Sequence, residues 1–79
     1  MRPEPPTLLS IVIPARNEEA SIASTVQHLH LELKLKRVPH QIIVVDDGST
    51  DRTWEILIQE SQRISELKPL QNLGPHGFG

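Results

Sequence analysis

The feature that most constrains this chain is an unbroken apolar run that ends in two acids. Residues 42–45 read Ile-Ile-Val-Val, and Asp46 and Asp47 follow directly. Because these β-branched residues do not alternate with polar ones, the run is typical of a strand buried on both faces, as in a parallel sheet. The two acids then lie just past the carboxyl end of the strand, where open α/β sheets bind their ligands. We therefore expect a binding site here rather than a solvated loop.

Length and composition exclude several classes of protein. The chain has 79 residues, a formal net charge of −2 and no cysteine. One small domain fits this length, and a disulfide framework is excluded. The charge gives no reason to expect nucleic acid as a partner. The longest apolar runs have about five residues, whereas a membrane helix needs about 20, so we expect no membrane segment in this chain.

The first residues and the remainder differ in character. Residues 1–7 are rich in proline and predict a disordered lead-in. They contain no apolar segment of the kind that a secretory signal requires. We therefore expect a cytoplasmic location, with membrane association left open for the complete protein. Residues 8–79 carry the folding pattern and are interpreted as the front part of a larger domain.

Strand and helix patterns alternate along the rest of the chain. Three short apolar segments predict strands, and two longer segments with apolar residues every three or four positions predict amphipathic helices. The expected spans are a strand at 8–13, a helix at 18–36, a strand at 41–46, a helix at 51–64 and a strand at 67–72. This order predicts parallel strands joined by right-handed crossovers. The predicted class is α/β, with the elements in the order β-α-β-α-β and an incomplete sheet.

Single residues refine these boundaries. Pro14 lacks an N–H, so the first strand is expected to stop there. Asn17 is the expected N-cap of the first helix, which places Glu18 in the first turn, where the helix dipole favours acids. Pro69 restricts the third strand to an edge of the sheet, or leaves no strand there at all. The inner face of the second helix is expected to carry Trp54, Leu57, Ile58 and Ile64.

Two polar loops are expected to lie side by side at the carboxyl end of the sheet. One loop follows the first strand at residues 14–19, and the other is the acidic turn at residues 46–51. The acid pair of the second loop could hydrogen-bond the base or ribose of a ligand, or support a metal ion. The plainer alternative is that one aspartate caps the turn and the other is solvated. Helix capping explains the residues around Asn17, but it does not explain Arg16.

Several familiar motifs are absent. The sequence has no GxxxxGK[ST] phosphate loop, no GxGxxG after the first strand and no EF-hand spacing, which argues against a P-loop NTPase, a standard dinucleotide fold and a calcium loop. His28 and His30 are two positions apart on the first helix and cannot share a face. We interpret both, together with His40, as surface residues rather than metal ligands.

Two segments read together resemble the opening of a family 2 glycosyltransferase. They are SIVIPARNEE at residues 10–19 and IVVDDGSTD at residues 43–51, and NLGPHGFG at 72–79 resembles the next loop of that family. The nearest branch is that of the polyprenyl-phosphate, or dolichol-phosphate, mannosyl- and glucosyltransferases, whose opening reads IPARNEE or IPAYNEE. The resemblance covers about residues 9–79, and the two motifs at this separation are specific as a pair.

The resemblance implies a Rossmann-like GT-A fold, three-layered with parallel strands, of which residues 8–79 would be the N-terminal part. It implies a nucleotide-sugar donor, such as a UDP- or GDP-sugar, and a lipid-phosphate or other acceptor in the complete protein. A divalent ion, Mg²⁺ or Mn²⁺, would bind the donor diphosphate. The donor-binding residues that it implies are Pro14, Ala15, Arg16, Asn17, Glu18, Asp46, Asp47 and Gly77.

The implied roles differ among these residues. Residues 14–16 would lie along the nucleoside, and Glu18 would contact the nucleoside or support the loop. Asp47 would bind the base, with Asp46 as its structural neighbour. Gly77 would lie near the donor ribose and diphosphate. Many relatives have tyrosine where this chain has Arg16, so stacking on the base at this position stays open.

The family's metal-binding Asp-x-Asp and its catalytic base lie further along than Gly79. We therefore expect no catalytic and no metal-binding residue in this chain, and whether it acts as an enzyme by itself stays open. The alternatives are a non-catalytic nucleotide-binding module and an inactive truncated remnant. A phosphoacceptor domain fits less well, because it would need a lysine at a strand end on the ligand side.

Overall fold

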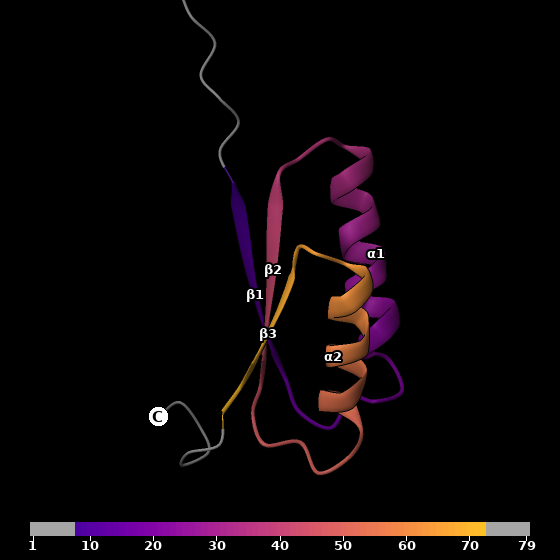
Figure 1. Cartoon of the computed structure of the whole chain (residues 1–79), viewed down its shortest axis with the longest axis vertical. Coiled ribbons are helices and arrows are strands. Elements are labelled where there is room, and N and C mark those ends of the chain that lie inside the picture. The colour runs from indigo at the N-terminus through magenta and orange to yellow at the C-terminus, as the bar shows by residue number, and fades with distance from the viewer. Residues whose placement is uncertain (1–7, 73–79) are drawn as a thin grey trace, which may run out of the picture.

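The structure is a computed structural model that describes residues 8–72. The lead-in expected at residues 1–7 and the loop that contains Gly77 lie outside the described residues. In chain order the elements are β1 (Leu9–Ala15), α1 (Ile22–Leu35), β2 (His40–Asp46), α2 (Thr53–Arg63) and β3 (Leu67–Gln71). The strands form one parallel sheet in the order β1-β2-β3 (Figure 1). The predicted α/β class, element order and open sheet are confirmed.

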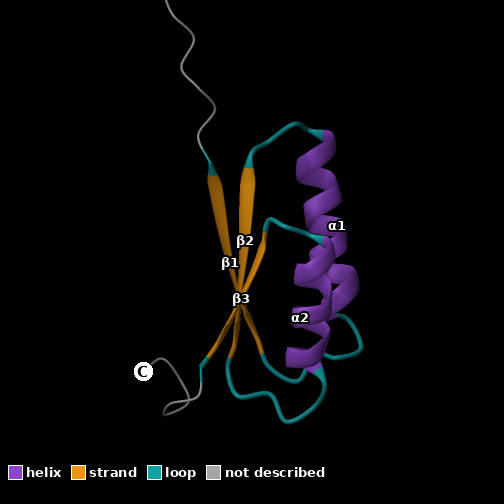
Figure 2. Ribbon diagram, viewed as in Figure 1, coloured by secondary structure: helices purple, strands orange, loops and turns teal. Residues whose placement is uncertain are grey.

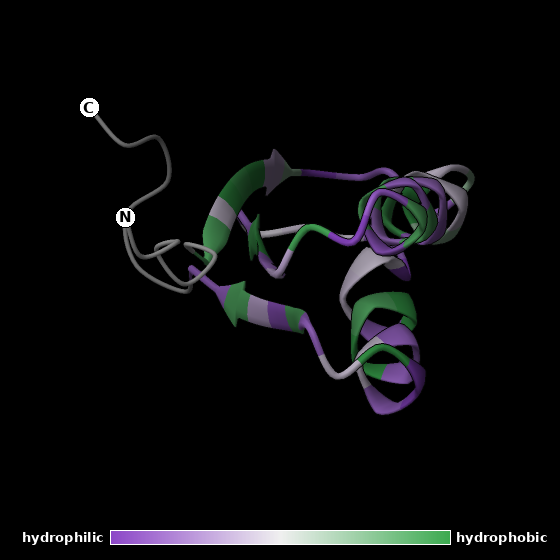
Figure 3. Cartoon of the chain, turned by 90° about the horizontal axis from the view of Figure 1, so that it is seen from above, coloured by the Kyte–Doolittle hydropathy of each residue, from purple (hydrophilic) through white to green (hydrophobic). Residues whose placement is uncertain are grey.

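Both helices lie on the same face of the sheet, as Figures 2 and 3 show from two directions. The two crossovers have the same handedness, and each leads to the next strand in the same direction across the sheet. They therefore place both helices on one face. The other face carries Val12, Ile43 and Leu70, which lie in strand positions that alternate with the core residues. Within residues 8–72 no helix covers this second face. A third layer therefore stays an expectation from the family resemblance.

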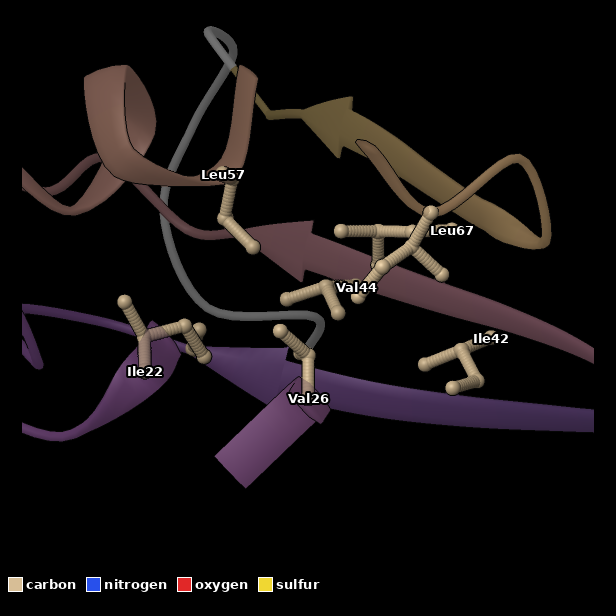
Figure 4. Packing of buried hydrophobic residues seen from close by; sticks show 8 residues of the cluster. Ile22, Val26, Ile42, Val44, Leu57 and Leu67 are labelled. Atoms are coloured by element: carbon tan, nitrogen blue, oxygen red, sulfur yellow. The ribbon is translucent and has the colours of Figure 1, made fainter. Parts of the chain in front are cut away.

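The hydrophobic core lies between β2 and the two helices. Its largest fully buried apolar side chains come from α1, β2 and α2, and Figure 4 shows them converging: Ile22, Val26, Ile42, Val44 and Leu57. Along β2 the residues alternate between buried and half-buried. The prediction of a strand buried on both faces was therefore wrong for the described part, because both helices pack on the same side of the sheet.

The first strand continues past Pro14, contrary to the prediction. Pro14 pairs with Val45 and Ala15 pairs with Asp46 in the parallel register. The main-chain bonds explain this, since the N–H of Leu9 donates to the carbonyl of Pro39 and the carbonyl of Ala15 accepts from Asp47. Odd-numbered residues of β1 thus bond to β2, and the nitrogen of Pro14 faces the open side. A proline is tolerated on an edge strand in that orientation.

Both helices begin later than predicted. α1 starts at Ile22 with Ser21 as the N-cap residue, and its first turn contains no acid. Asn17 has a φ of 52° and lies in the left-handed region, so its expected role as N-cap was wrong. α2 starts at Thr53. Ile58 is 37% exposed rather than on the inner face, whereas Leu57 and Ile64 are buried as predicted.

The third strand lies at an edge as predicted, whereas one histidine that was predicted to lie on the surface is buried. β3 pairs with β2 only and lies at an edge of the described sheet, as Pro69 predicted. His28 is exposed, as expected. His40, however, was predicted to lie on the surface and is only 6% exposed. It is buried because it opens the central strand β2, beneath the second half of α1, where His30 contacts its ring.

Candidate functional site

The parallel register brings the ends of all three strands together. Ala15 is paired with Asp46, and the N–H of Asp47 donates to the carbonyl of Ala15 over 2.9 Å. On the other side, the N–H of Asn72 donates to the carbonyl of Asp46 over 2.8 Å. The two motif loops therefore adjoin, as predicted. We call this the carboxyl end of the sheet, and it is where open α/β sheets bind ligands.

Asp46 builds the turn that follows β2. Its side chain is fully buried, and Oδ1 accepts hydrogen bonds from both the backbone N–H, at 3.1 Å, and the hydroxyl of Ser49. Gly48 has a φ of 71°, which glycine adopts without the steric cost that a Cβ would add. Among the described residues Oδ2 of Asp46 has no hydrogen-bond partner. Through Oδ1 this buried side chain supports the turn.

Asp47 lies between the ends of β1 and β3. It is half-buried, and its Oδ1 accepts a hydrogen bond of 2.9 Å from the side-chain amide of Asn72. Asn72 thus positions the carboxylate that the resemblance assigns to the base. Sequence reasoning did not include Asn72 in the site. The signal available was its position one residue past β3, at the same end of the sheet.

Asn17 ties the two loops together. Its N–H donates to the hydroxyl of Ser49 over 2.9 Å. Its Oδ1 accepts from the N–H of Thr50 at 2.8 Å, from the Thr50 hydroxyl at 3.3 Å and from the N–H of Asp51 at 3.4 Å. A short amide side chain is one of the few that tolerates the left-handed conformation. We call these bonds across the two loops the loop clamp.

A second group of bonds extends the loop clamp. The N–H of Glu18 donates to the buried hydroxyl of Thr53 over 2.7 Å, and the N–H of Glu19 donates to Oδ2 of Asp51 over 3.2 Å. Asp51 Oδ1 also accepts from the N–H and hydroxyl of Thr53. Partial desolvation raises the pKa of Asp51, but these hydrogen bonds outweigh it and hold the pKa below its ordinary value of 3.8.

The remaining predicted residues occupy different positions at this end. Pro14 and Glu18 are exposed, whereas Ala15 is buried in the core at 3% exposure and offers a ligand only its backbone. Arg16 is exposed, and within residues 8–72 its side chain forms no hydrogen bond or ion pair. Seven of the eight predicted residues are thus brought to one end of the sheet, and Gly77 lies outside the described residues.

These residues do not form a cage for a divalent ion. Hard cations such as Mg²⁺ need several oxygen ligands around one point. In the described part, no three carboxylate or histidine side chains converge at this end of the sheet. Asp46 commits one oxygen to Ser49, and Asp47 accepts from Asn72. The described carboxyl end therefore does not fit the metal that the family resemblance implies.

An open parallel sheet with clamped polar loops at its carboxyl end defines an α/β protein of the Rossmann-like type. Residues 10–77 match the family described as Glycosyl transferase family 2. The chain therefore belongs to glycosyltransferase family 2, and its described part is a partial Rossmann-like GT-A fold.

Three relatives show what the chain is similar to. It is 38% identical over 63 residues to an undecaprenyl-phosphate 4-deoxy-4-formamido-L-arabinose transferase of Pseudomonas paraeruginosa, and 42% identical over 64 residues to one of Pseudomonas aeruginosa. Each match covers 80% of the chain and 19% of the relative. A Bacillus subtilis protein named uncharacterized glycosyltransferase YkoT is 37% identical over 76 residues, and the match covers 85% of the chain and 23% of that protein.

The chain thus spans about a fifth of the length of these relatives. Neither helix between residues 8 and 72 is long and apolar enough to cross a membrane.

Proposed function

We propose that residues 8–79 are the N-terminal, nucleoside-recognising part of a glycosyltransferase domain that uses a UDP- or GDP-sugar as donor. The complete protein would transfer the sugar to a polyprenyl phosphate or a similar lipid phosphate, and would work at a membrane surface. Membership of family 2 supports the transferase class. The names of the two Pseudomonas relatives, which are undecaprenyl-phosphate transferases, support the acceptor class.

The observation that carries this proposal is the loop clamp beside Asp47. The bonds from Asn17 to Ser49, Thr50 and Asp51 hold the first loop against the second. A site held by such bonds before the ligand arrives binds with a smaller loss of conformational entropy. The clamp thereby presents the exposed Arg16 and the half-buried Asp47 at the same end of the sheet.

Each residue would then have a distinct role toward the donor. Asp47, oriented by Asn72, would accept a hydrogen bond from an N–H of the base. The backbone of residues 14–16 would lie along the nucleoside, as would the stem of Arg16, whose guanidinium suits an anionic or planar group. Glu18 would support the first loop. Asp46 would act through Ser49 as a positioning residue.

Metal binding and the catalytic step would be carried out by other parts of the complete protein. The family generally uses a divalent ion on the donor diphosphate, where it would neutralise charge on the leaving group. The described carboxyl end does not supply the ligands of that ion, so these residues would bind the nucleoside and take no part in the catalytic step. Apolar residues on the uncovered face of the sheet, such as Val12 at 63% exposure, are consistent with further elements of a larger domain.

The substitution Asp47→Asn tests the proposed site. Replacing the carboxylate by an amide removes a charge-assisted hydrogen bond, which is worth about 1.5–3 kcal/mol, so binding should weaken at least ~10-fold. Isothermal titration calorimetry of the 79-residue chain with UDP and with GDP measures this. Glu32→Gln, an exposed change of the same kind on α1, is the matched control and should bind like the unaltered chain.

Two results would contradict the proposal. One is the absence of heat with both nucleotides for a chain that circular dichroism shows to be folded. The other is equal affinity of the Asp47→Asn and Glu32→Gln variants, which would place the nucleotide away from the acid pair.

A further inference from the structure

A second cluster of chemically active side chains lies at the opposite end of the sheet, where β2 and β3 begin. His30 comes from α1, His40 is the first residue of β2, and Glu66 immediately precedes β3. One potential ligand atom from each of the three lies within 4.8 Å of the others. Because parallel strands run the same way, this amino end is separated from the nucleoside site by the length of β2. The proposed function makes no use of it.

Hydrogen bonding fixes the tautomer of His40. Its Nδ1 is 2.8 Å from the carbonyl oxygen of Val38, which can only accept, so Nδ1 carries the hydrogen. Nε2 of the neutral ring then presents a lone pair toward His30. Metal-binding histidines are typically oriented in this way, with the second ring nitrogen donating to a carbonyl or carboxylate. His40 is 6% exposed, so its orientation is also held by packing.

The other two groups complete a ligand set. His30 Nδ1 is 2.9 Å from His40 Nε2 and 3.9 Å from Oε1 of Glu66. The side chains of His30 and Glu66 are 17% and 39% exposed, which leaves a route from solvent to buried His40. A hydrogen bond from the backbone N–H of Glu66 lowers the pKa of its carboxyl, desolvation opposes this, and Ser65, His30 and His40 add smaller lowering effects. The carboxylate is therefore ionised at neutral pH.

The spacing of the two histidine nitrogens is close to what a tetrahedral ion requires, whereas the Glu66 carboxylate, 3.9 Å from His30 Nδ1, would move closer on binding. Zinc binds imidazole nitrogen at about 2.0–2.1 Å, so two ligand nitrogens lie about 3.3 Å apart. The two histidine nitrogens are 2.9 Å apart, so they would separate by about 0.4 Å, and the rings would turn so that both lone pairs point to the ion rather than along the present hydrogen bond. Two imidazoles and one carboxylate are a known zinc donor set, with water as the fourth ligand.

We propose that His30, His40 and Glu66 form a binding site for a transition-metal dication of the Zn²⁺ type. The ion would take the place of the hydrogen that His30 Nδ1 now shares with His40 Nε2, and that hydrogen would move, through solvent, to Nε2 of His30, so that both rings stay neutral ligands. It would join α1, the start of β2 and the segment before β3. Nitrogen ligands favour Zn²⁺ over Mg²⁺, so this site differs in ion preference from an all-oxygen site on a diphosphate.

Zinc titration of the tag-free chain tests the site. In 5 mM Mg²⁺, against a chromophoric chelator, we expect one Zn²⁺ to bind per chain, with the excess Mg²⁺ unable to displace it. The variants His30→Gln and Glu66→Gln should each weaken zinc binding at least ~10-fold. His28→Gln is the matched control, because His28 is an exposed histidine of the same helix and should leave binding unchanged.

A second readout does not depend on the variants folding. In NMR spectra of the unaltered chain, zinc should shift the imidazole signals of His30 and His40 and leave those of His28 in place. The proposal would be overturned if the folded chain took up no zinc. It would also be overturned if His30→Gln bound zinc as tightly as His28→Gln, or if the His28 signals moved instead. In that case the three side chains would have only a structural role, with His30 as the hydrogen-bond partner of buried His40.

Discussion

Replacing Ile42 with alanine is expected to lower the free energy of unfolding by about 2–5 kcal/mol. Ile42 is fully buried on the central strand, where it faces the core that both helices cover (Figure 4). Truncation loses the favourable free energy of transferring the deleted methyl and methylene groups from water to the core. It also leaves a cavity that the neighbouring side chains fill only in part. A chain of 79 residues has little stability to spare, because a small domain buries only about 60% of its unfolded surface.

Urea unfolding followed by circular dichroism measures this loss, and two further variants make it interpretable. Ile42→Val should cost about 0.5–1.5 kcal/mol and stays measurable even where the alanine variant is unfolded in water. Val12→Ala is the matched control, because Val12 is 63% exposed on the uncovered face and should change stability by less than about 0.5 kcal/mol. Equal losses from Ile42→Val and Val12→Ala would show that the core does not lie where we place it.

Replacing Asn17 with alanine is expected to cost about 1.5–3.5 kcal/mol, the largest effect of any exposed residue in the candidate site. Alanine at a φ of 52° carries a left-handed penalty of about 1–2 kcal/mol that asparagine largely avoids. The substitution also removes the Oδ1 acceptor for Thr50 and Asp51, at about 0.5–1.5 kcal/mol. The same unfolding experiment measures the sum.

Glycine at the same position separates the two causes. Asn17→Gly removes the acceptor but accepts the left-handed backbone freely, so it should cost about 1 kcal/mol. If the alanine and glycine variants were equally stable, the left-handed conformation of residue 17 would be wrong. If both were as stable as the unaltered chain, the loop clamp would contribute nothing to the fold.

Parts of the fold that depend on local pattern could be predicted from the sequence. The apolar run of residues 42–45 and the turn after it identify β2 and its acidic loop. Apolar residues every three or four positions predict α1 as an amphipathic helix, and Ile22 and Val26 are the residues that it buries. Alternation of strands and helices then leaves few topologies, because crossovers between parallel strands have one hand. The meeting of the two motif loops follows directly from that topology.

What could not be predicted depends on contacts between segments far apart in the chain. Asparagine suits an N-cap and a left-handed turn equally well, and only the second loop, more than thirty residues away, decides the role of Asn17. His40 looked like a surface residue because its partners, His30 and Glu66, lie on other elements. The extension of β1 through Pro14 depends on which side of the strand the proline nitrogen faces.

The central claim is that this chain recognises a nucleoside at the carboxyl end of its sheet. The most direct measurement is an NMR titration of the ¹⁵N-labelled chain with UDP and GDP. We predict that the backbone amide signals of Ala15, Arg16, Asp47 and Gly48 shift together with one binding constant, while those of His40 and Glu66 at the amino end do not move. Shifts confined to the amino end, or no shifts with either nucleotide in a folded chain, would contradict the claim.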